Sequence, residues 1–232
     1  MKRLIQHLTK NEKAALMVHG IFTVLCVAVL AAPVAFPPGQ RLTFLVSFYL
    51  VTMLFIGFLI KDVEWLKLLG FCFILSLFQV FPDWFLSAQL DILVFPEDGF
   101  PKIGTVSGYM AGLWTIPLFI IIFVGSRVKA RFTEKAALIT VAAASLLIFG
   151  VSEEMVWMIP SWYAKNVTVL GHTALYILIP EMLLGLSAYM AYEKAKSGTL
   201  LKQGLAAFFV MTLYIGNSAF FYFLLERLIL GK

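Results

Sequence analysis

Long apolar runs separated by short polar segments dominate the pattern of this chain. A helix needs about 20 mostly apolar residues to cross a bilayer, and seven stretches meet that requirement. We expect them near residues 14–36, 42–60, 65–95, 108–128, 136–156, 169–192 and 205–228. Pro82 is expected to break or kink the third run. The pattern therefore predicts an all-α integral membrane protein, a single bundle of seven transmembrane helices.

The composition agrees with this class of protein. Hydrophobic residues make up 61% of the 232 positions and charged residues 13%, whereas soluble domains carry about 25% charged residues. We therefore expect one multi-pass membrane domain over residues 1–232, surrounded by membrane lipids. The first apolar run follows a basic start and lacks a small-residue cleavage site, so we interpret it as a retained helix. Together with the short loops, this start is typical of a bacterial inner membrane protein.

Lysine and arginine are distributed unevenly between the predicted loops. If the N-terminus is inside, 13 of the 18 basic residues fall on the inner side and 5 on the outer side. The positive-inside rule therefore predicts a cytoplasmic N-terminus and an outside C-terminus. The inner segments then carry a net charge of +8 and the outer segments −3, which together give the +5 of the chain. The excess positive charge thus reflects topology, and no nucleic-acid partner is expected.

Acidic residues show the opposite bias. Eight of the thirteen lie in or beside apolar spans on the outer side: Asp83, Asp91, Glu97, Asp98, Glu153, Glu154, Glu181 and Glu226. A charged carboxylate at the centre of a membrane helix costs roughly 2.5–3.5 kcal/mol. Acids in such positions are therefore candidates for function.

The third span carries a regular polar spacing. Gln79, Asp83, Ser87 and Asp91 are four residues apart and would share one face of a helix, lining a cavity open to the outer side. Alternatively, the chain leaves the membrane at Pro82, and Asp83 caps a following interfacial helix. Both interpretations stay open for Asp83, and the second is favoured for Asp91.

Two adjacent acids, Glu153 and Glu154, end the fifth span. Neighbouring helical residues point about 100° apart, so we expect one acid to face the bundle and the other a loop or the headgroups. Repulsion between close carboxylates favours one neutral acid beside one anion, a combination that general acid–base catalysis uses. The alternative is an interfacial pair without chemistry.

The sixth span supplies a histidine and the acid that lies deepest by count. Glu181 falls about halfway across, directly after Pro180, which leaves a backbone carbonyl one turn earlier without its usual donor. His172 is a candidate proton relay to Glu153 or Glu154. The alternatives are a histidine at headgroup level and a Glu181 that is only hydrogen-bonded within the bundle.

Aromatic and polar residues complete the candidate set. Aromatic ring faces can stabilise a cation, although polar side chains in membranes often only hold helices together. The candidate substrate-binding residues are Trp114, Tyr176, Trp157, Tyr214, Asn217 and Asp91.

These residues favour a membrane-embedded enzyme that acts on a lipid or isoprenoid. A protonated carboxyl group can donate its proton to an alkene or epoxide, while other carboxylates and aromatic rings stabilise the cation and a base removes a proton. Cyclase, isomerase and hydratase reactions are of this type. The candidate catalytic residues are Glu153, Glu154, Asp83, Glu181 and His172.

In size and number of spans the chain resembles small seven-helix membrane terpene cyclases. The likeness is architectural, and no family motif aligns, so no residue role is carried over from it. No multi-histidine, Walker-type or paired-cysteine motif is present, and neither a metal nor a cofactor is expected. The alternative functions are a proton- or cation-coupled transporter or channel subunit and a non-catalytic lipid-binding or assembly protein.

Overall fold

Seven helices long and apolar enough to cross a membrane are present in the computed structural model, which describes residues 8–32, 35–159 and 161–231 without the side chain of Trp157. The seven main helices are α2 (Lys10–Ala31), α3 (Pro38–Ile60), α4 (Val63–Trp84), α6 (Thr115–Arg131), α7 (Glu134–Met155), α8 (Leu178–Ala195) and α9 (Leu200–Tyr222). Short turns extend five of them: η1 (Phe85–Gln89), α5 (Met110–Leu113), η2 (Val156–Met158), η3 (Leu175–Ile177) and η4 (Phe223–Ile229). The prediction of seven helices with the length and composition needed to span a membrane is confirmed.

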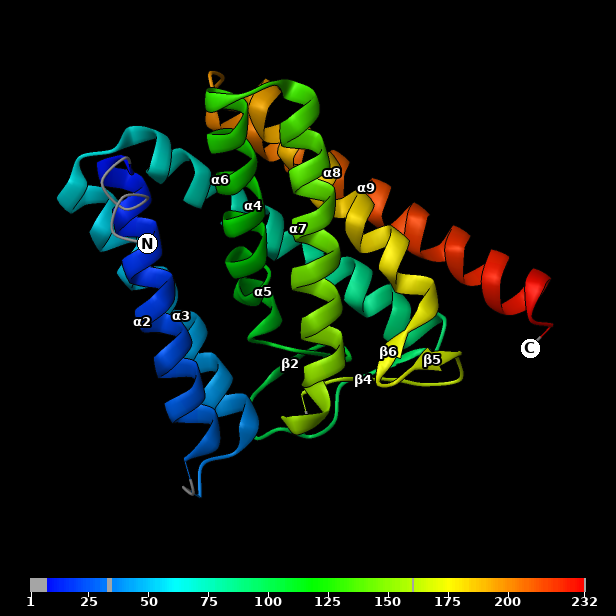
Figure 1. The fold of residues 1–232 in the computed structure, drawn as a ribbon. Coiled ribbons are helices and arrows are strands. Elements are labelled where there is room, and N and C mark those ends of the chain that lie inside the picture. The colour runs from blue at the N-terminus through cyan, green and yellow to red at the C-terminus, as the bar shows by residue number, and fades with distance from the viewer. Residues whose placement is uncertain (1–7, 33–34, 160, 232) are drawn as a thin grey trace.

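The helices that start on the predicted inner side begin at short polar residues. Thr9 and Glu12 form a reciprocal capping box at α2, and Asp62 accepts hydrogen bonds from two backbone N–H groups at the start of α4. Thr133 and Thr199 cap α7 and α9 in the same way. Such caps satisfy backbone donors that a helix start leaves unpaired. They allow sharp, short connections at this end of the bundle (Figure 1).

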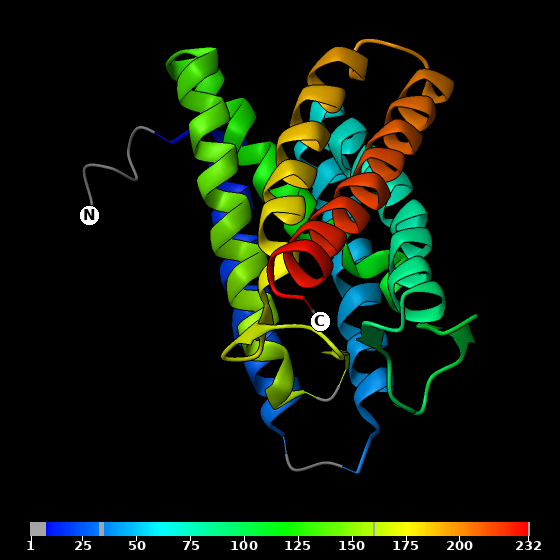
Figure 2. The ribbon, with the colours of Figure 1, turned by 90° about the vertical axis from the view of Figure 1, so that its right-hand side faces the viewer.

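The opposite end carries longer connections with three antiparallel strand pairs. β2 (Lys102–Ile103) pairs with β3 (Val106–Ser107), and β5 (Val169–Leu170) pairs with β6 (Thr173–Ala174). β1 (Leu93–Val94) pairs with β4 (Tyr163–Ala164), which joins the connection after α4 to the connection after α7. Figures 1 and 2 both show these strands gathered at one end of the bundle, which we call the strand-bearing end.

The helices form three groups in space. α2 and α3 lie side by side at one edge of the molecule, and the tilted α9 lies at the other, with α4, α6, α7 and α8 between them (Figure 1). Fully buried side chains such as Phe71, Leu75, Phe119 and Leu184 fill the interior between α4, α6 and α8. Many large apolar side chains on the outer faces of the helices are exposed, as expected for surfaces that contact lipid.

Some helix boundaries differ from the predicted ones. The interruption expected at Pro82 is not observed, because α4 continues through this residue and widens into the π-helical turn η1 only after Trp84. The third span ends at Gln89 rather than at residue 95, because β1 follows it. The sixth span starts at Leu175 rather than at residue 169, because residues 169–174 form the β5–β6 hairpin.

Candidate functional site

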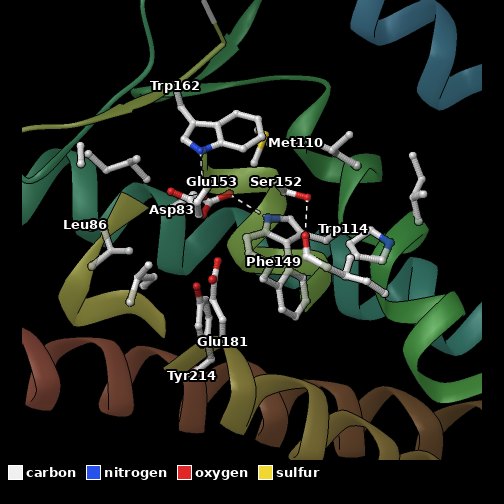
Figure 3. A pocket seen from close by; sticks show the side chains of 18 of the residues that line it. Asp83, Leu86, Met110, Trp114, Phe149, Ser152, Glu153, Trp162, Glu181 and Tyr214 are labelled. Atoms are coloured by element: carbon white, nitrogen blue, oxygen red, sulfur yellow. Dashed lines mark hydrogen bonds between the residues drawn. The ribbon is translucent and has the colours of Figure 1, made fainter. Parts of the chain in front are cut away.

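A cavity of about 300 Å³ lies in the half of the bundle nearest the strand-bearing end. Three acids from three helices converge on it: Asp83 from α4, Glu153 from α7 and Glu181 from α8 (Figure 3). The remaining lining is mostly apolar and aromatic, and the described lining residues include no lysine, arginine or histidine. We call this space the acid cavity.

Asp83 lies inside α4 and is almost completely buried. Its Oδ2 accepts a hydrogen bond of 3.1 Å from the indole N–H of Trp114, which stands where α5 meets α6. Asp83 therefore does not cap an interfacial helix, which was the alternative that its sequence left open. The Trp114 ring also contacts Phe149 and Tyr214, with centroids 5.6 and 5.9 Å away. This packing fixes the indole that binds Asp83.

Glu153 receives a second indole. Its Oε1 accepts a hydrogen bond of 3.0 Å from Trp162 Nε1. Trp162 directly precedes β4, and the pairing of β4 with β1 folds its loop back over the cavity. The loop after α7 thus reaches into the bundle, where Trp162 lines the cavity.

Glu181 differs from the other two acids. It is only 3% exposed, and its Oε2 is buried without a hydrogen-bond partner in the described part of the chain. Figure 3 shows Glu181 and Tyr214 pointing toward Asp83 and Glu153. Buried polar atoms in proteins are nearly always hydrogen-bonded. The unpartnered oxygen therefore points to a ligand or a water as its partner.

The three acids are expensive to hold together as anions. They lie within electrostatic range of one another, and no cation among the described lining residues offsets their charge. Burying a charge without a partner costs much more than burying a neutral carboxyl group. The arrangement therefore suits groups that exchange protons with a bound molecule.

The structure places the other predicted residues in several locations. Tyr176 and Tyr214 line the acid cavity together with Trp114. Asn217 instead lines a groove between α7, α8 and α9, and Asp91 forms a surface ion pair of 2.8 Å with Lys165. The side chain of Trp157 lies outside the described residues.

Glu154 and His172 lie outside the acid cavity and bind each other. Glu154 accepts hydrogen bonds from the His172 backbone N–H at 2.8 Å and from Thr173 Oγ1 at 3.1 Å, and its Oε1 lies 3.2 Å from His172 Nδ1. Gly171 has a positive φ of 64°, and a Cβ there would lie 2.5 Å from the Glu154 carboxylate. Glu154 thus holds the β5–β6 hairpin against α7. The adjacent acids divide as predicted, one toward the bundle and one toward a loop.

The remaining acids of the predicted outer side also have partners. Glu97 pairs with Lys102 at 2.7 Å, and the buried Asp98 accepts hydrogen bonds from the Ser107 hydroxyl and the Phe100 backbone. Glu226 accepts two hydrogen bonds from Thr168, at 2.8 and 3.0 Å. These acids hold the connections of the strand-bearing end in place.

Most lining residues were missed by the sequence reasoning, among them Phe149 and Trp162. Phe149 lies one helical turn before Glu153 on the same face of α7, and that spacing could have identified it. Trp162 could not be identified in this way, because its position depends on strand pairing between segments 70 residues apart.

The described residues contain no group of three histidine, cysteine, aspartate or glutamate side chains placed to hold a metal. A family model described as "Domain of unknown function (DUF6989)" matches residues 80–225, and the chain therefore belongs to that family. The matched region contains the three cavity acids and both indole donors, whereas α2 and α3 precede it. No curated protein and no solved structure matched the chain.

Proposed function

We propose that this protein is a membrane-embedded enzyme that acts on a lipid or isoprenoid by general acid–base catalysis in the acid cavity. The observation that carries the proposal is the convergence of Asp83, Glu153 and Glu181 in a mostly apolar cavity with no basic residue among its described lining. Its volume of about 300 Å³ is at the lower end of the range of ligand pockets, roughly 300–1,000 Å³. With the orientation predicted from the loop charges, the cavity opens in the outer half of the membrane.

The geometry supports a division of roles among the acids. Glu181 is assigned as the proton donor, because its Oε2 has no partner among the described residues and its side chain lines the cavity. Asp83 and Glu153 each accept an indole N–H, which stabilises an anionic oxygen, so they are assigned to stabilise positive charge and to accept a proton. The faces of Trp114, Phe149 and Tyr214 add cation–π stabilisation.

The proposed reaction is redox-neutral. The carboxyl proton adds to one carbon of a carbon–carbon double bond, and the neighbouring carbon becomes a carbocation. A second double bond of the same molecule then attacks the carbocation to close a ring, or no ring forms. Loss of a proton from an adjacent carbon to a carboxylate gives a cyclised or isomerised product, and capture by water gives a hydrated one. After either outcome the acceptor carboxylate holds a proton, and this proton passes back to Glu181 to restore the starting state. No oxidant or reductant is needed.

The lining supports catalysis better than ion transport. On α6 and α7 the cavity is lined by apolar side chains, including Ile116, Ile120 and Ile148. A path for a cation or proton needs polar groups or water along its length. The cavity offers hydrocarbon there, which suits the body of an apolar substrate.

The proposal is tested by mass spectrometry of lipids and isoprenoids from cells that express the wild type, Glu153→Gln or Glu154→Gln at equal membrane levels. Glu154 is the matched control, because it is the neighbouring acid in the chain and binds the β5–β6 hairpin instead of lining the cavity. We expect a new or depleted species with the wild type and Glu154→Gln, absent with Glu153→Gln. Identical profiles for all three, in a host supplied with isoprenoid precursors, would contradict the proposal.

A further inference from the structure

A second cavity, of about 500 Å³, lies between α2 and α6 toward the end opposite the strands. Its walls are mostly apolar, and its charged groups are Glu12 from α2 and Arg127 and Arg131 from the last turns of α6. We call this space the α2–α6 groove. Two guanidinium groups face one carboxylate there, which leaves an excess positive charge at the mouth.

Arg127 has a hydrogen-bond donor that no described residue accepts from. Arg131 donates to Glu12 at 2.5 Å, so these two groups neutralise each other. The Nε of Arg127 is buried and has no hydrogen-bond partner in the described part of the chain, and its guanidinium lies 5.0 Å from the centre of the Phe123 ring. A guanidinium held in this way presents planar N–H donors that match phosphate oxygens. Basic pockets between helices near the cytoplasmic face are known to bind anionic headgroups.

The α2–α6 groove and the acid cavity share a boundary. Ile120 lines both, and α2 contributes His19, Gly20 and Thr23 to the groove and Phe22 and Cys26 to the acid cavity. A Cβ built at Gly20 would meet no atom within 4 Å, so the groove is open at this point. The ring nitrogens of His19 are already bonded to Ala15 O and the Tyr49 hydroxyl. The two spaces therefore follow the same pair of helices from the basic mouth to the acids.

The distance along this route suits a chain molecule. Thirteen residues separate Arg127 from Trp114, the residue that donates to Asp83. At about 1.5 Å per residue they span about 20 Å along the helix axis. The small volume of the acid cavity has room for the end of one hydrocarbon chain rather than for a bulky lipid.

We propose that the ligand of this route is a single-chain isoprenoid with a phosphate-ester head. Arg127 binds the phosphate at the inner end, the chain runs between α2 and α6 past Ile120, and its far end lies at Asp83, Glu153 and Glu181. The assignment of this ligand as substrate rests on the function proposed above, whereas the binding itself does not. The reaction then takes place at the end of the molecule remote from its charge.

The test uses a geranylgeranyl monophosphate that carries a photoreactive diazirine at the end remote from the phosphate, with purified protein in phosphatidylcholine nanodiscs. We expect labelling in residues 148–153 or 176–181. Arg127→Gln should reduce it about tenfold, because a charge-assisted hydrogen bond is lost. Gly20→Leu should reduce it similarly by filling the groove. Labelling confined to α2 and the inner part of α6, or spread without preference, would overturn the proposal.

Two variants serve as matched controls. Lys129→Gln removes a nearby cation that binds Glu134 and Glu193 instead of facing the groove, and Gly216→Leu fills open space on α9. Both should label like the wild type. Labelling reduced equally in the controls and in the Arg127 and Gly20 variants would contradict the route.

Competition identifies the kind of ligand. Unmodified geranylgeranyl monophosphate should suppress labelling, whereas geranylgeraniol, inorganic phosphate and dioleoyl phosphatidic acid should do so at least tenfold less well. Equal competition by the neutral alcohol would show that the phosphate head is not recognised, which would overturn the proposal. Equal competition by phosphatidic acid would also overturn it and would assign the groove to membrane phospholipid. Binding needs no proton transfer, so labelling of the wild type does not depend on the proposed reaction. Labelling without any converted lipid would therefore refute the proposed reaction but not the proposed binding of the ligand.

Discussion

Glu226 and Glu181 are both almost completely buried, at 1% and 3% exposure, but their surroundings differ. Both oxygens of Glu226 accept hydrogen bonds from Thr168, so this acid fastens η4, the extension of α9, to the loop before β5. Glu181 Oε2 has no such partner among the described residues, and the Glu181 side chain lines a cavity. Burial alone therefore does not identify a functional acid. The partners of each oxygen separate an acid that holds the fold from an acid that awaits a ligand.

Glu153 and Glu154, which are adjacent in α7, show the same contrast between an acid bonded to a loop and an acid that faces the cavity. Glu154 satisfies its oxygens with the β5–β6 hairpin, whereas Glu153 faces the acid cavity with one indole N–H. The following changes test whether the contrast between loop acids and cavity acids holds, in order of expected effect.

The largest effect is expected for Glu181→Gln. The amide keeps the size and polarity of the side chain but cannot donate a proton as the acid does, and general acid catalysis contributes about 10²–10⁴-fold. Formation of the acid-dependent lipid product should fall at least 100-fold. Thermal unfolding in detergent should remain within a few degrees of the wild type, since no hydrogen bond to Oε2 is lost. If the variant still forms the product, Glu181 is not the proton donor.

Trp162→Phe should have a smaller effect on the same product. The ring remains to cover the cavity, but the hydrogen bond to Glu153 is lost, and a hydrogen bond to a charged group contributes about 1.5–3 kcal/mol. We expect product formation to fall by roughly tenfold or more. Tyr163→Phe is a suitable control, because Tyr163 is half exposed on β4 and does not line the cavity. Equal losses in both variants would indicate general damage to the loop.

Glu226→Ala should affect stability rather than chemistry. It leaves the Thr168 N–H and hydroxyl without these acceptors, which costs about 1–3 kcal/mol for a buried group. Asp91→Asn weakens only an exposed ion pair and should cost less than 1 kcal/mol. Chemical denaturation of both proteins in detergent measures the difference. A lost product in a folded Glu226→Ala protein would place this acid with the cavity acids.

The smallest effect is expected for Glu154→Gln. It weakens the attachment of the β5–β6 hairpin, so amide hydrogen exchange in residues 169–174 should become faster while product formation stays at the wild-type level. Unchanged exchange would show that the hairpin is held by its other contacts.

The helices were predictable because hydrophobic length and composition determine them. The sequence also singled out Asp83, Glu153 and Glu181 as candidates, because acids within apolar spans are conspicuous. The sequence could not separate them from Glu154, Asp91 and His172, because that distinction depends on which loop folds over which helix. The π-helical turn after Trp84 ends at Gln89, so Asp91 lies beyond the helix and does not share a face with Asp83; the sequence reasoning had favoured the other interpretation for Asp91. Pro82 was expected to interrupt α4, but the helix continues through it.

Deuterium transfer to carbon is the most direct test of the claim that cavity acids deliver a proton to a lipid. Nanodiscs with the purified protein and an isoprenoid extract would be incubated in D₂O, and the products analysed by mass spectrometry. We predict a product with one carbon-bound deuterium from the wild type and from Glu154→Gln, and none from Glu181→Gln. No deuterated product from the wild type, or the same yield from Glu181→Gln, would contradict the account.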